Sequence, residues 1–211
     1  MSIQYKISGE TDWRRVESFA DLVTYEQKAM AQSSPRISSI KSNEITHEDM
    51  SSIGLFTELQ ILDLHNPQVS DISALSSCRQ LQELYLRETQ VSDIRALSSC
   101  TQLQKLDLMR SKISDIRALS SCSRLEYLNL RNTQVSDIGA LSSCTKLEEL
   151  NLWKVPVSDI RALSSCTELK ILQLCRTQVI DISALSSCRQ LERLNLCRTS
   201  VRDIRALSFC I

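Results

Sequence analysis

Thiols recur in this chain of 211 residues at a fixed interval of 22 residues. The recurring cysteines are Cys78, Cys100, Cys122, Cys144, Cys166, Cys188 and Cys210. Thiols can form disulfides or bind a metal, but both uses need sulfur atoms that converge. If the units stack, equivalent atoms lie about 4.8 Å apart and point the same way. We therefore expect these cysteines to be reduced and buried, as small apolar side chains.

Carboxylates recur at the same interval. The recurring aspartates are Asp71, Asp93, Asp115, Asp137, Asp159, Asp181 and Asp203. Each precedes a short apolar segment, such as Ile94 to Leu97, that ends at a cysteine of the series. A carboxylate in this place accepts hydrogen bonds from the exposed N–H groups of a short helical turn. The segment has only about six residues, so we predict a 3-10 turn and a capping role for the aspartates.

The other residues with catalytic potential are few and scattered. Neither histidine, His47 or His65, falls in a metal-ligand pattern, and three glycines cannot build a phosphate-binding loop. Asp63 and Asp107 would lie about 9.6 Å apart on alternate units, near the spacing of an inverting carboxylate pair. An open face offers them no pocket that excludes water. We therefore predict no catalytic, cofactor-binding or metal-binding residues, no cofactor and no enzyme activity.

Aromatic and basic side chains fall at outward-facing positions of the repeated unit. Aromatic residues and arginine are enriched in the hot spots of protein interfaces. The aromatic residues and Met109 are expected to cluster in the middle of this face, with cations around them. We predict a partner-binding surface made of Tyr85, Arg87, Met109, Arg110, Tyr127, Arg131, Trp153, Lys154, Arg176 and Arg198.

Two other interpretations of this surface stay open. Its residues could be exposed strand side chains without a partner. Aromatic rings between arginines could also stack on the bases of single-stranded nucleic acid. Against that, Glu83, Glu88, Asp107 and Glu149 share the surface and would repel a phosphate chain. The formal net charge of zero also gives no support to general nucleic-acid binding. An acidic protein surface is therefore the expected partner.

Two cysteines stand outside the regular series. Cys175 and Cys197 occupy the same outward position on adjacent units, and Arg176 and Arg198 follow them. Nearby cations lower the pKa of a thiol and raise its reactivity. A redox or metal role is one hypothesis for this pair, and two exposed thiols without a function is the alternative.

The elements that position these side chains follow from the unit that begins at Leu81. Leu84 and Leu86 alternate with polar residues, and this period of two predicts a short strand with its leucines inward. The chain turns at Thr89 and re-enters the core at Val91. A fixed 22-residue period with a Leu-x-x-Leu-x-Leu core predicts a leucine-rich solenoid, in which successive strands lie parallel.

The Leu-x-x-Leu-x-Leu strand and the Val-Ser-Asp-Ile-x-Ala-Leu turn resemble one known class of repeat. This is the 22-residue leucine-rich repeat of bacterial internalin-like proteins and of a eukaryotic regulator of protein phosphatase 1. The resemblance covers residues 37–211. It implies an α/β fold, a right-handed solenoid with a parallel concave sheet and short 3-10 turns on the convex side. The ninth position, often Asn in this class, is Thr89 and its equivalents here, so hydroxyls must form its backbone ladder or the ladder is partly absent.

The resemblance also implies a function. It points to a non-catalytic scaffold that binds a partner protein on the concave face, as in a cytosolic regulator. A secreted or surface adhesin or effector of the internalin-like type is the alternative. A substrate-recruiting part of an enzyme complex is a further alternative, although nothing in the chain supplies the catalytic residues.

Two regions are predicted along the chain. Residues 37–211 form the solenoid, with one degenerate and seven regular repeats, and residues 1–36 form an N-terminal capping segment. In that segment Ile3, Tyr5 and Ile7 alternate as one strand, and Thr11-Asp12 is expected to cap an amphipathic helix that runs to about Gln32. The helix covers the first coil or, alternatively, binds a partner. Its expected apolar face is Trp13, Val16, Phe19, Ala20 and Val23.

The ends of the chain give two further expectations. No stretch approaches the roughly 20 apolar residues that span a bilayer, and the N-terminus has no apolar core of signal-peptide length. These observations predict a cytoplasmic protein without membrane contact. The last unit runs to Phe209-Cys210-Ile211 without a polar cap, which solenoids generally need. Truncation of a longer chain, fraying of the last coil, and end-to-end self-association are the three alternatives.

Overall fold

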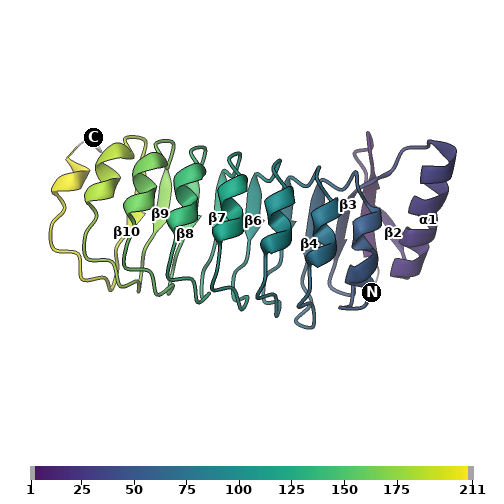
Figure 1. The fold of residues 1–211 in the computed structure, drawn as a ribbon, viewed down its shortest axis with the longest axis horizontal. Coiled ribbons are helices and arrows are strands. Elements are labelled where there is room, and N and C mark those ends of the chain that lie inside the picture. The colour runs from purple at the N-terminus through teal and green to yellow at the C-terminus, as the bar shows by residue number, and fades with distance from the viewer. Residues whose placement is uncertain (1–2, 209–211) are drawn as a thin grey trace.

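Each 22-residue unit forms one coil, and the coils stack side by side along an extended axis (Figure 1). The computed structural model describes residues 3–208. Its helix and strands are β1 (Ile3–Ile7), β2 (Arg14–Val16), α1 (Phe19–Gln32), β3 (Ile37–Ser42), β4 (Ile61–Leu64), β5 (Glu83–Tyr85), β6 (Lys105–Asp107), β7 (Tyr127–Asn129), β8 (Glu149–Asn151), β9 (Ile171–Gln173) and β10 (Arg193–Asn195). A 3-10 helix follows each strand from β3 onward: η1 (Asp49–Leu55), η2 (Ser73–Ser77), η3 (Arg95–Ser99), η4 (Arg117–Ser121), η5 (Gly139–Ser143), η6 (Arg161–Ser165), η7 (Ser183–Ser187) and η8 (Arg205–Leu207).

The strands of the repeats form one parallel sheet. The strand order is β10-β9-β8-β7-β6-β5-β4-β3-β1-β2, and all neighbours from β3 to β10 are parallel. Partners are 22 residues apart, so Leu84 pairs with Leu62 on one side and Leu106 on the other. These leucines have no exposed surface, which confirms the inward leucines predicted from the alternation. Each coil thus buries its apolar face against its neighbours.

The first two strands extend this sheet in the antiparallel sense. β1 lies between β3 and β2 and is antiparallel to both. The strand predicted at Ile3, Tyr5 and Ile7 is present, and these three side chains are buried. The repeat pattern could not indicate the antiparallel end of the sheet, because β1 and β2 lie outside the repeats.

The opposite side of each coil is a 3-10 turn held by a capping aspartate. In η3, the Leu97 N–H donates to the Ile94 carbonyl at 2.9 Å, which is a bond between residues three apart. Asp93 Oδ1 accepts a hydrogen bond from the Arg95 N–H at 2.8 Å. The other recurring aspartates accept the equivalent bond. Both the 3-10 turns and the capping role of the aspartates are confirmed.

The thiols of the recurring series that lie within residues 3–208 are buried inside the coils. Cys122 Sγ donates to the Leu97 carbonyl at 3.6 Å, and so joins its coil to the one before. Burial raises the pKa of the Cys122 thiol to about 12. Cys78 through Cys166 of the series are buried and free, as predicted. Cys188 is also buried, and Cys210 lies outside the described residues.

At the ninth position of the repeated unit, side-chain hydroxyls bond backbone carbonyls in some coils and not in others. Thr89 Oγ1 donates to the Leu86 carbonyl at 2.9 Å, and Thr133, Thr177 and Thr199 make the same bond. The hydroxyl of Ser111 is buried without a partner in the described chain. The ladder is therefore made by threonine and interrupted elsewhere, as the sequence allowed.

The N-terminal helix is shorter than predicted. Its start at Thr11-Asp12 is wrong, because residues 14–16 form β2 and α1 begins at Phe19. Ser18 and Asp21 form a capping box there, in which each side chain bonds the other's backbone N–H. The predicted apolar face is therefore also wrong in part: Trp13 precedes the helix and is 41% exposed. The end at Gln32 is correct.

The helix packs on the first coil through a different face, made of Phe19, Leu22, Glu26 and Ala29. The ring centroids of Phe19 and Phe56 lie 5.7 Å apart. Glu26 is fully buried and accepts from Arg36 Nε at 2.6 Å and from the Ile37 N–H at 3.0 Å. The apolar face of α1 thus packs within the chain, and the Ile37 N–H joins Glu26 to the start of β3.

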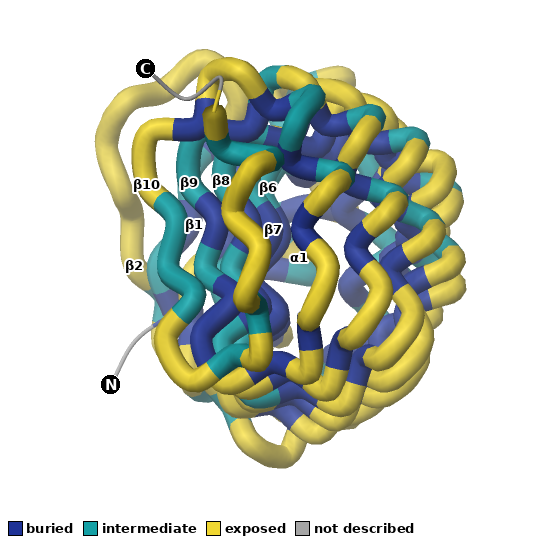
Figure 2. Tube along the Cα trace, turned by 90° about the vertical axis from the view of Figure 1, so that its left-hand side faces the viewer, coloured by how far each residue is buried: buried dark blue, intermediate teal, exposed yellow. Residues whose placement is uncertain are grey.

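The coil from Leu191 to Ser208 is the least buried one. Its residues Leu194, Leu196, Val201 and Leu207 are only partly buried, and Ile204 is 61% exposed. Figure 2 shows this coil nearest the viewer, coloured mostly as exposed or intermediate. Self-association through this end remains a prediction.

Candidate protein-binding face

The concave face consists of the outward side chains of β4 to β10 and the second and third residues after each strand from β5 on. In each regular unit from β5 on, the third residue after the strand has a left-handed backbone, with φ between 55° and 61°. These residues are Glu88, Arg110, Asn132, Lys154, Arg176 and Arg198. A left-handed conformation costs roughly 1–2 kcal/mol for a residue with a Cβ, and Asn tolerates it best. Apart from Asn132, these residues have long charged side chains at a position where the left-handed backbone favours glycine.

Carboxylates and cations pair between coils in the N-terminal half of this face. Asp107 is only 2% exposed, and its Oδ2 accepts from Arg87 Nε at 2.7 Å and from Asn129 Nδ2 at 3.2 Å. Lys105 Nζ lies 2.9 Å from Glu83 Oε1. Because Asp107 is buried and paired, it does not form the open carboxylate pair with Asp63 that the sequence spacing allowed.

The remaining paired cation is Arg110, which bonds Glu88 of the preceding coil. Three of the four acidic residues expected to repel a phosphate chain, Glu83, Glu88 and Asp107, are therefore neutralised by neighbours. Two of the predicted binding cations, Arg87 and Arg110, are occupied in the same way.

The cations of the C-terminal half are different. Arg131, Lys154, Arg176, Arg193 and Arg198 form no ion pair with any residue in the described range 3–208. Arg131 Nε is buried and has no hydrogen-bond partner there. Arg193 was not among the binding residues predicted from the sequence.

Trp153 lies in the middle of this unpaired half. The guanidinium carbon of Arg131 is 4.4 Å from the centre of the Trp153 ring, and that of Arg176 is 5.3 Å away. The two arginines come from the coils on either side. A guanidinium within about 6 Å of an indole ring is attracted to its face, so the tryptophan holds both cations near it.

The other aromatic residues of the predicted surface, within the described range, make no ring-to-ring contact with Trp153. Tyr85 lies beside Arg87, with the guanidinium carbon 5.2 Å from its ring centre, and its hydroxyl donates to Glu83 at 2.8 Å. Burial raises the pKa of Tyr85 and of Tyr127. Among the described residues, Tyr85, Tyr127 and Trp153 make no ring-to-ring contacts with one another, and the cations beside Tyr85 and Trp153 are arginines. The single cluster expected from the sequence stays a prediction.

The two outlying thiols lie at the end of the same face. Cys175 is 3% exposed, so the expectation that both thiols are exposed is wrong for Cys175 and correct for Cys197. Their sulfur atoms are 2.7 Å apart. This contact and burial raise the pKa of Cys175, although Trp153 and Arg176 act in the opposite direction. The prediction that the arginines lower this pKa overall is therefore wrong, because the neighbouring thiol has the larger effect.

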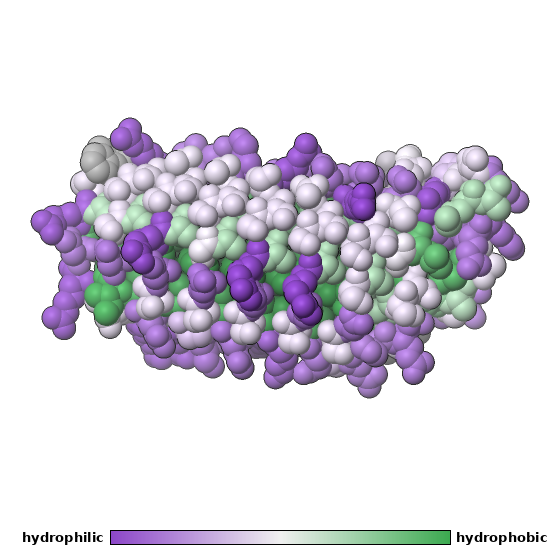
Figure 3. All heavy atoms as spheres, viewed as in Figure 1, coloured by the Kyte–Doolittle hydropathy of each residue, from purple (hydrophilic) through white to green (hydrophobic). Residues whose placement is uncertain are grey.

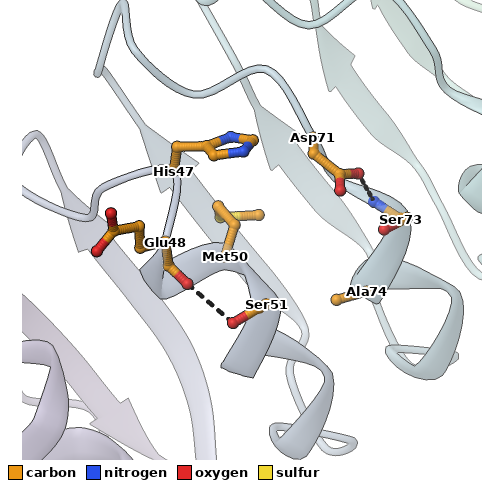
Figure 4. Close-up of a pocket in the computed structure, with 7 residues that line it drawn as sticks. All are labelled: His47, Glu48, Met50, Ser51, Asp71, Ser73 and Ala74. Carbon is orange, nitrogen blue, oxygen red and sulfur yellow. Dashed lines mark hydrogen bonds between the residues drawn. The ribbon is translucent and has the colours of Figure 1, made fainter.

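Several recesses lie on the side of the 3-10 turns, which Figure 3 shows face on. One recess of about 580 Å³ lies between η1 and η2 and is lined by His47 and Asp71, among others (Figure 4). His47 Nδ1 is 3.2 Å from Ser70 Oγ, but Asp71 bonds the Ser73 N–H like every capping aspartate. Recesses of similar size recur between later coils. Their recurrence marks them as a product of coil stacking.

Two further properties concern metals and membranes. Among residues 3–208, no three His, Cys, Asp or Glu side chains gather in a way that could hold a metal ion. Within the same range, α1 and the 3-10 turns are too short or too polar to cross a membrane.

Comparison with known proteins agrees with this architecture. The family model for leucine-rich repeats matches residues 79–121 and 123–165. A search of curated proteins finds no match. Internalin C2 of Listeria monocytogenes is 24% identical with a TM-score of 0.79, over 96% of this chain and 84% of its own.

Two other solved structures share the fold over part of their length. Another internalin of Listeria monocytogenes is 25% identical with a TM-score of 0.66, over 76% of this chain and 54% of its own. A leucine-rich repeat protein of Leptospira interrogans is 22% identical with a TM-score of 0.70, over 76% of this chain and 43% of its own. This chain thus spans about half the length of these two proteins. Its repeats, its sheet and these matches identify the chain as a leucine-rich repeat protein.

Proposed function

We propose that this protein is a non-catalytic scaffold that binds a partner protein on its concave face. The observation that carries the proposal is the position of Trp153 between Arg131 and Arg176 of the neighbouring coils. Tryptophan and arginine are the residue types most enriched in interface hot spots. Here they are held together before any partner arrives, which reduces the entropy lost on binding.

The partner is expected to present an acidic surface to the C-terminal half of the face. The cations of that half lack carboxylate partners within the described chain, whereas those of the N-terminal half are paired. Binding of a partner's carboxylate releases more free energy at an unpaired cation than at a cation that must first break an ion pair within the chain. Complementary charge of this kind also raises the rate of association.

The left-handed residues support the same surface. Lys154, Arg176 and Arg198 keep long cationic side chains where glycine would relieve the backbone. Departures from local preference are expected mainly at functional positions. These three residues flank Trp153 or follow it along the face, so they extend the proposed site in one direction.

A pull-down experiment tests this proposal. The wild-type protein and Trp153→Ala serve as baits, with Arg117→Ala on the 3-10 side as the matched control. We expect proteins recovered by the wild type and by Arg117→Ala to be lost with Trp153→Ala, and recovery to fall as salt rises. Equal loss with both variants would place the binding site elsewhere. Recovery that depends on RNA or DNA, as judged by nuclease treatment, would favour the nucleic-acid alternative.

A second candidate function is a secreted or surface adhesin or effector. The similarity in fold to two internalins favours it. The proposed face would serve this role equally, with a partner from outside the producing cell. We favour the cytoplasm because seven cysteines are free thiols, as in proteins of a reducing compartment: Cys78, Cys100, Cys122, Cys144, Cys166, Cys175 and Cys197. Fractionation of the producing cells, with detection of the native protein, distinguishes the two.

A further inference from the structure

We propose that Cys175 and Cys197 form a thiol oxidation site, in which peroxides convert the pair to a reversible disulfide. The two residues lie opposite each other on adjacent coils. Gln173 pairs with Asn195 in the sheet, and the Arg176 N–H donates to the Cys197 carbonyl at 2.9 Å, so the register continues past the strands. Adjacent strands lie about 4.8 Å apart, within the Cα separation of disulfides.

The sulfur atoms are already close to bonding distance. They are 2.7 Å apart, and a disulfide bond is about 2.05 Å long. A small rotation of either side chain brings them together without movement of the backbone. No other pair among the described cysteines makes such a contact: the thiols of the buried series bond backbone carbonyls of the preceding coil instead.

The exposure of the two residues gives them different roles in the reaction. Cys197 is exposed, whereas Cys175, beside it on the preceding coil, is buried. A peroxide therefore meets the Cys197 sulfur first. The Cys197 thiolate attacks one peroxide oxygen, the O–O bond breaks, and one water leaves while Cys197 becomes a sulfenic acid. The Cys175 thiolate then attacks that sulfur and releases a second water. In total, two thiols and hydrogen peroxide give one disulfide and two waters.

The disulfide would fix the least buried coil of the described chain. It closes a loop of 22 residues between the last two coils. Cross-linking restricts the open states of such a loop, so the coil detaches less readily. Leu194 and Leu196, which are only partly buried, would then remain packed on β9 for longer.

Peptide mapping after oxidation tests the proposal. The reduced full chain is treated with an equal amount of hydrogen peroxide at neutral pH, alkylated and digested with trypsin. Cleavage after lysine and arginine gives residues 171–176 and 194–198, each with a single cysteine of the pair. We expect these two peptides joined through their cysteines, with two alkylated thiols lost per chain and restored by dithiothreitol. A joined pair that appears only between two chains would overturn the proposal.

The chain provides its own control. Cys166 and Cys188 are also 22 residues apart, and trypsin places them in residues 162–170 and 177–189. They should not be joined under the same conditions, and Cys166→Ser should leave the Cys175–Cys197 product unchanged. Cys175→Ser should abolish it and leave Cys197 as a sulfenic acid, which dimedone traps. Equal joining of the control pair, or a trapped sulfenic acid at Cys197 in the wild type without joining, would contradict the proposed site.

Amide hydrogen exchange gives an independent measurement on the same samples. Oxidation should slow exchange of amides in residues 191–199 by about tenfold or more, because detachment of the coil limits it. Residues 81–100, far from the pair, should exchange at the same rate in both states. Unchanged exchange in residues 191–199 of a fully oxidised sample would show that the pair does not hold the last coil.

Discussion

The guanidinium of Arg131 lies 4.4 Å from the centre of the Trp153 ring, and the two residues are 22 positions apart, one coil from the next. This relationship shows how the solenoid builds a surface. Each coil supplies only a few outward side chains, so a binding site must combine residues from several coils. Arg176, from the following coil, completes the group around Trp153.

Trp153→Ala should weaken partner binding by roughly 2 kcal/mol, because truncation of a central interface aromatic commonly costs that much. The temperature of unfolding should change little, since the ring lies on the outside of the coil. Isothermal titration calorimetry and thermal unfolding measure the two effects. Arg117→Ala should leave the affinity unchanged, and an equal loss of affinity from that variant would argue against the concave face.

Cys122→Ser should destabilise the fold by about 1–3 kcal/mol, as expected for a buried hydroxyl with poor partners. The thiol now reaches the Leu97 carbonyl at 3.6 Å, a distance that suits sulfur and is too long for a hydroxyl. Urea unfolding measures the change. A variant as stable as the wild type would mean that the coil closes enough to bond the serine.

The labelling pattern of the folded protein follows from the same burial. Cys100, Cys122 and Cys144 should resist thiol reagents, since burial raises their pKa to about 11 or 12 and leaves almost no thiolate near neutral pH. Cys197 should react first. The sequence also predicts a reactive Cys175, but its burial now makes us expect slow labelling there.

Much of the fold could be predicted because the 22-residue period places equivalent residues in register. Leu62, Leu84 and Leu106 repeat at this interval, so one strand predicts the others. The helix start could not be found in this way, since Arg14–Val16 follow no repeat and pair with β1 through backbone bonds. Residue type alone gives little sign of such pairing.

The site could be predicted in composition but not in its pairing. The repeat showed which positions of the unit point outward, yet pairing depends on the residue at the same position in the next coil. Glu83 and Lys105 occupy the same position of consecutive units, as do Glu88 and Arg110. Opposite charges at one position of consecutive units were therefore a signal that could have been used. The contact between Cys175 and Cys197 was less accessible, because it depends on side-chain rotation rather than on spacing.

Acid should remove the contribution that the exposed Asp–Arg pairs at the 3-10 turns make to the free energy of unfolding. Hydrogen bonds from the Arg117 side chain and N–H hold the pKa of Asp115 at about 2, below its usual 3.8. A carboxyl with a lowered pKa in the folded state stabilises the fold above about pH 4, and this contribution is lost as the pH falls through about 2. Asp115→Asn should therefore be less stable than the wild type at pH 6, and the difference should disappear as the pH falls below about 2, as measured by urea unfolding. A difference that stays undiminished below pH 2 would mean that the carboxylate charge is not the cause.

If chains associate through the coil from Leu191 to Ser208, the mass of the particles in solution should rise with protein concentration. The apolar residues of this coil are only partly covered, and β10 pairs on one side only in the described sheet. An open edge strand with apolar neighbours tends to pair with another chain. Sedimentation velocity should show dimers of the 211-residue chain at high concentration, and Ile204→Lys should reduce them. Arg161→Lys, on a middle coil, is the control, and a monomer at all concentrations would exclude association.

Lys154→Gly should make the protein more stable and a weaker binder. Lys154 has a φ of 57°, which is costly for a residue with a Cβ and easy for glycine. The larger conformational freedom of glycine in the unfolded chain offsets part of this gain, so we expect about 0.5–1 kcal/mol of added stability. The matched control is Asn132→Gly, at the equivalent position with the same φ, where the gain should be near zero because asparagine tolerates this conformation. Chemical unfolding and calorimetric binding would be measured on both variants. Lys154→Gly that gains stability without losing affinity would show that the cation at this position does not serve binding, and that the strained backbone needs another explanation.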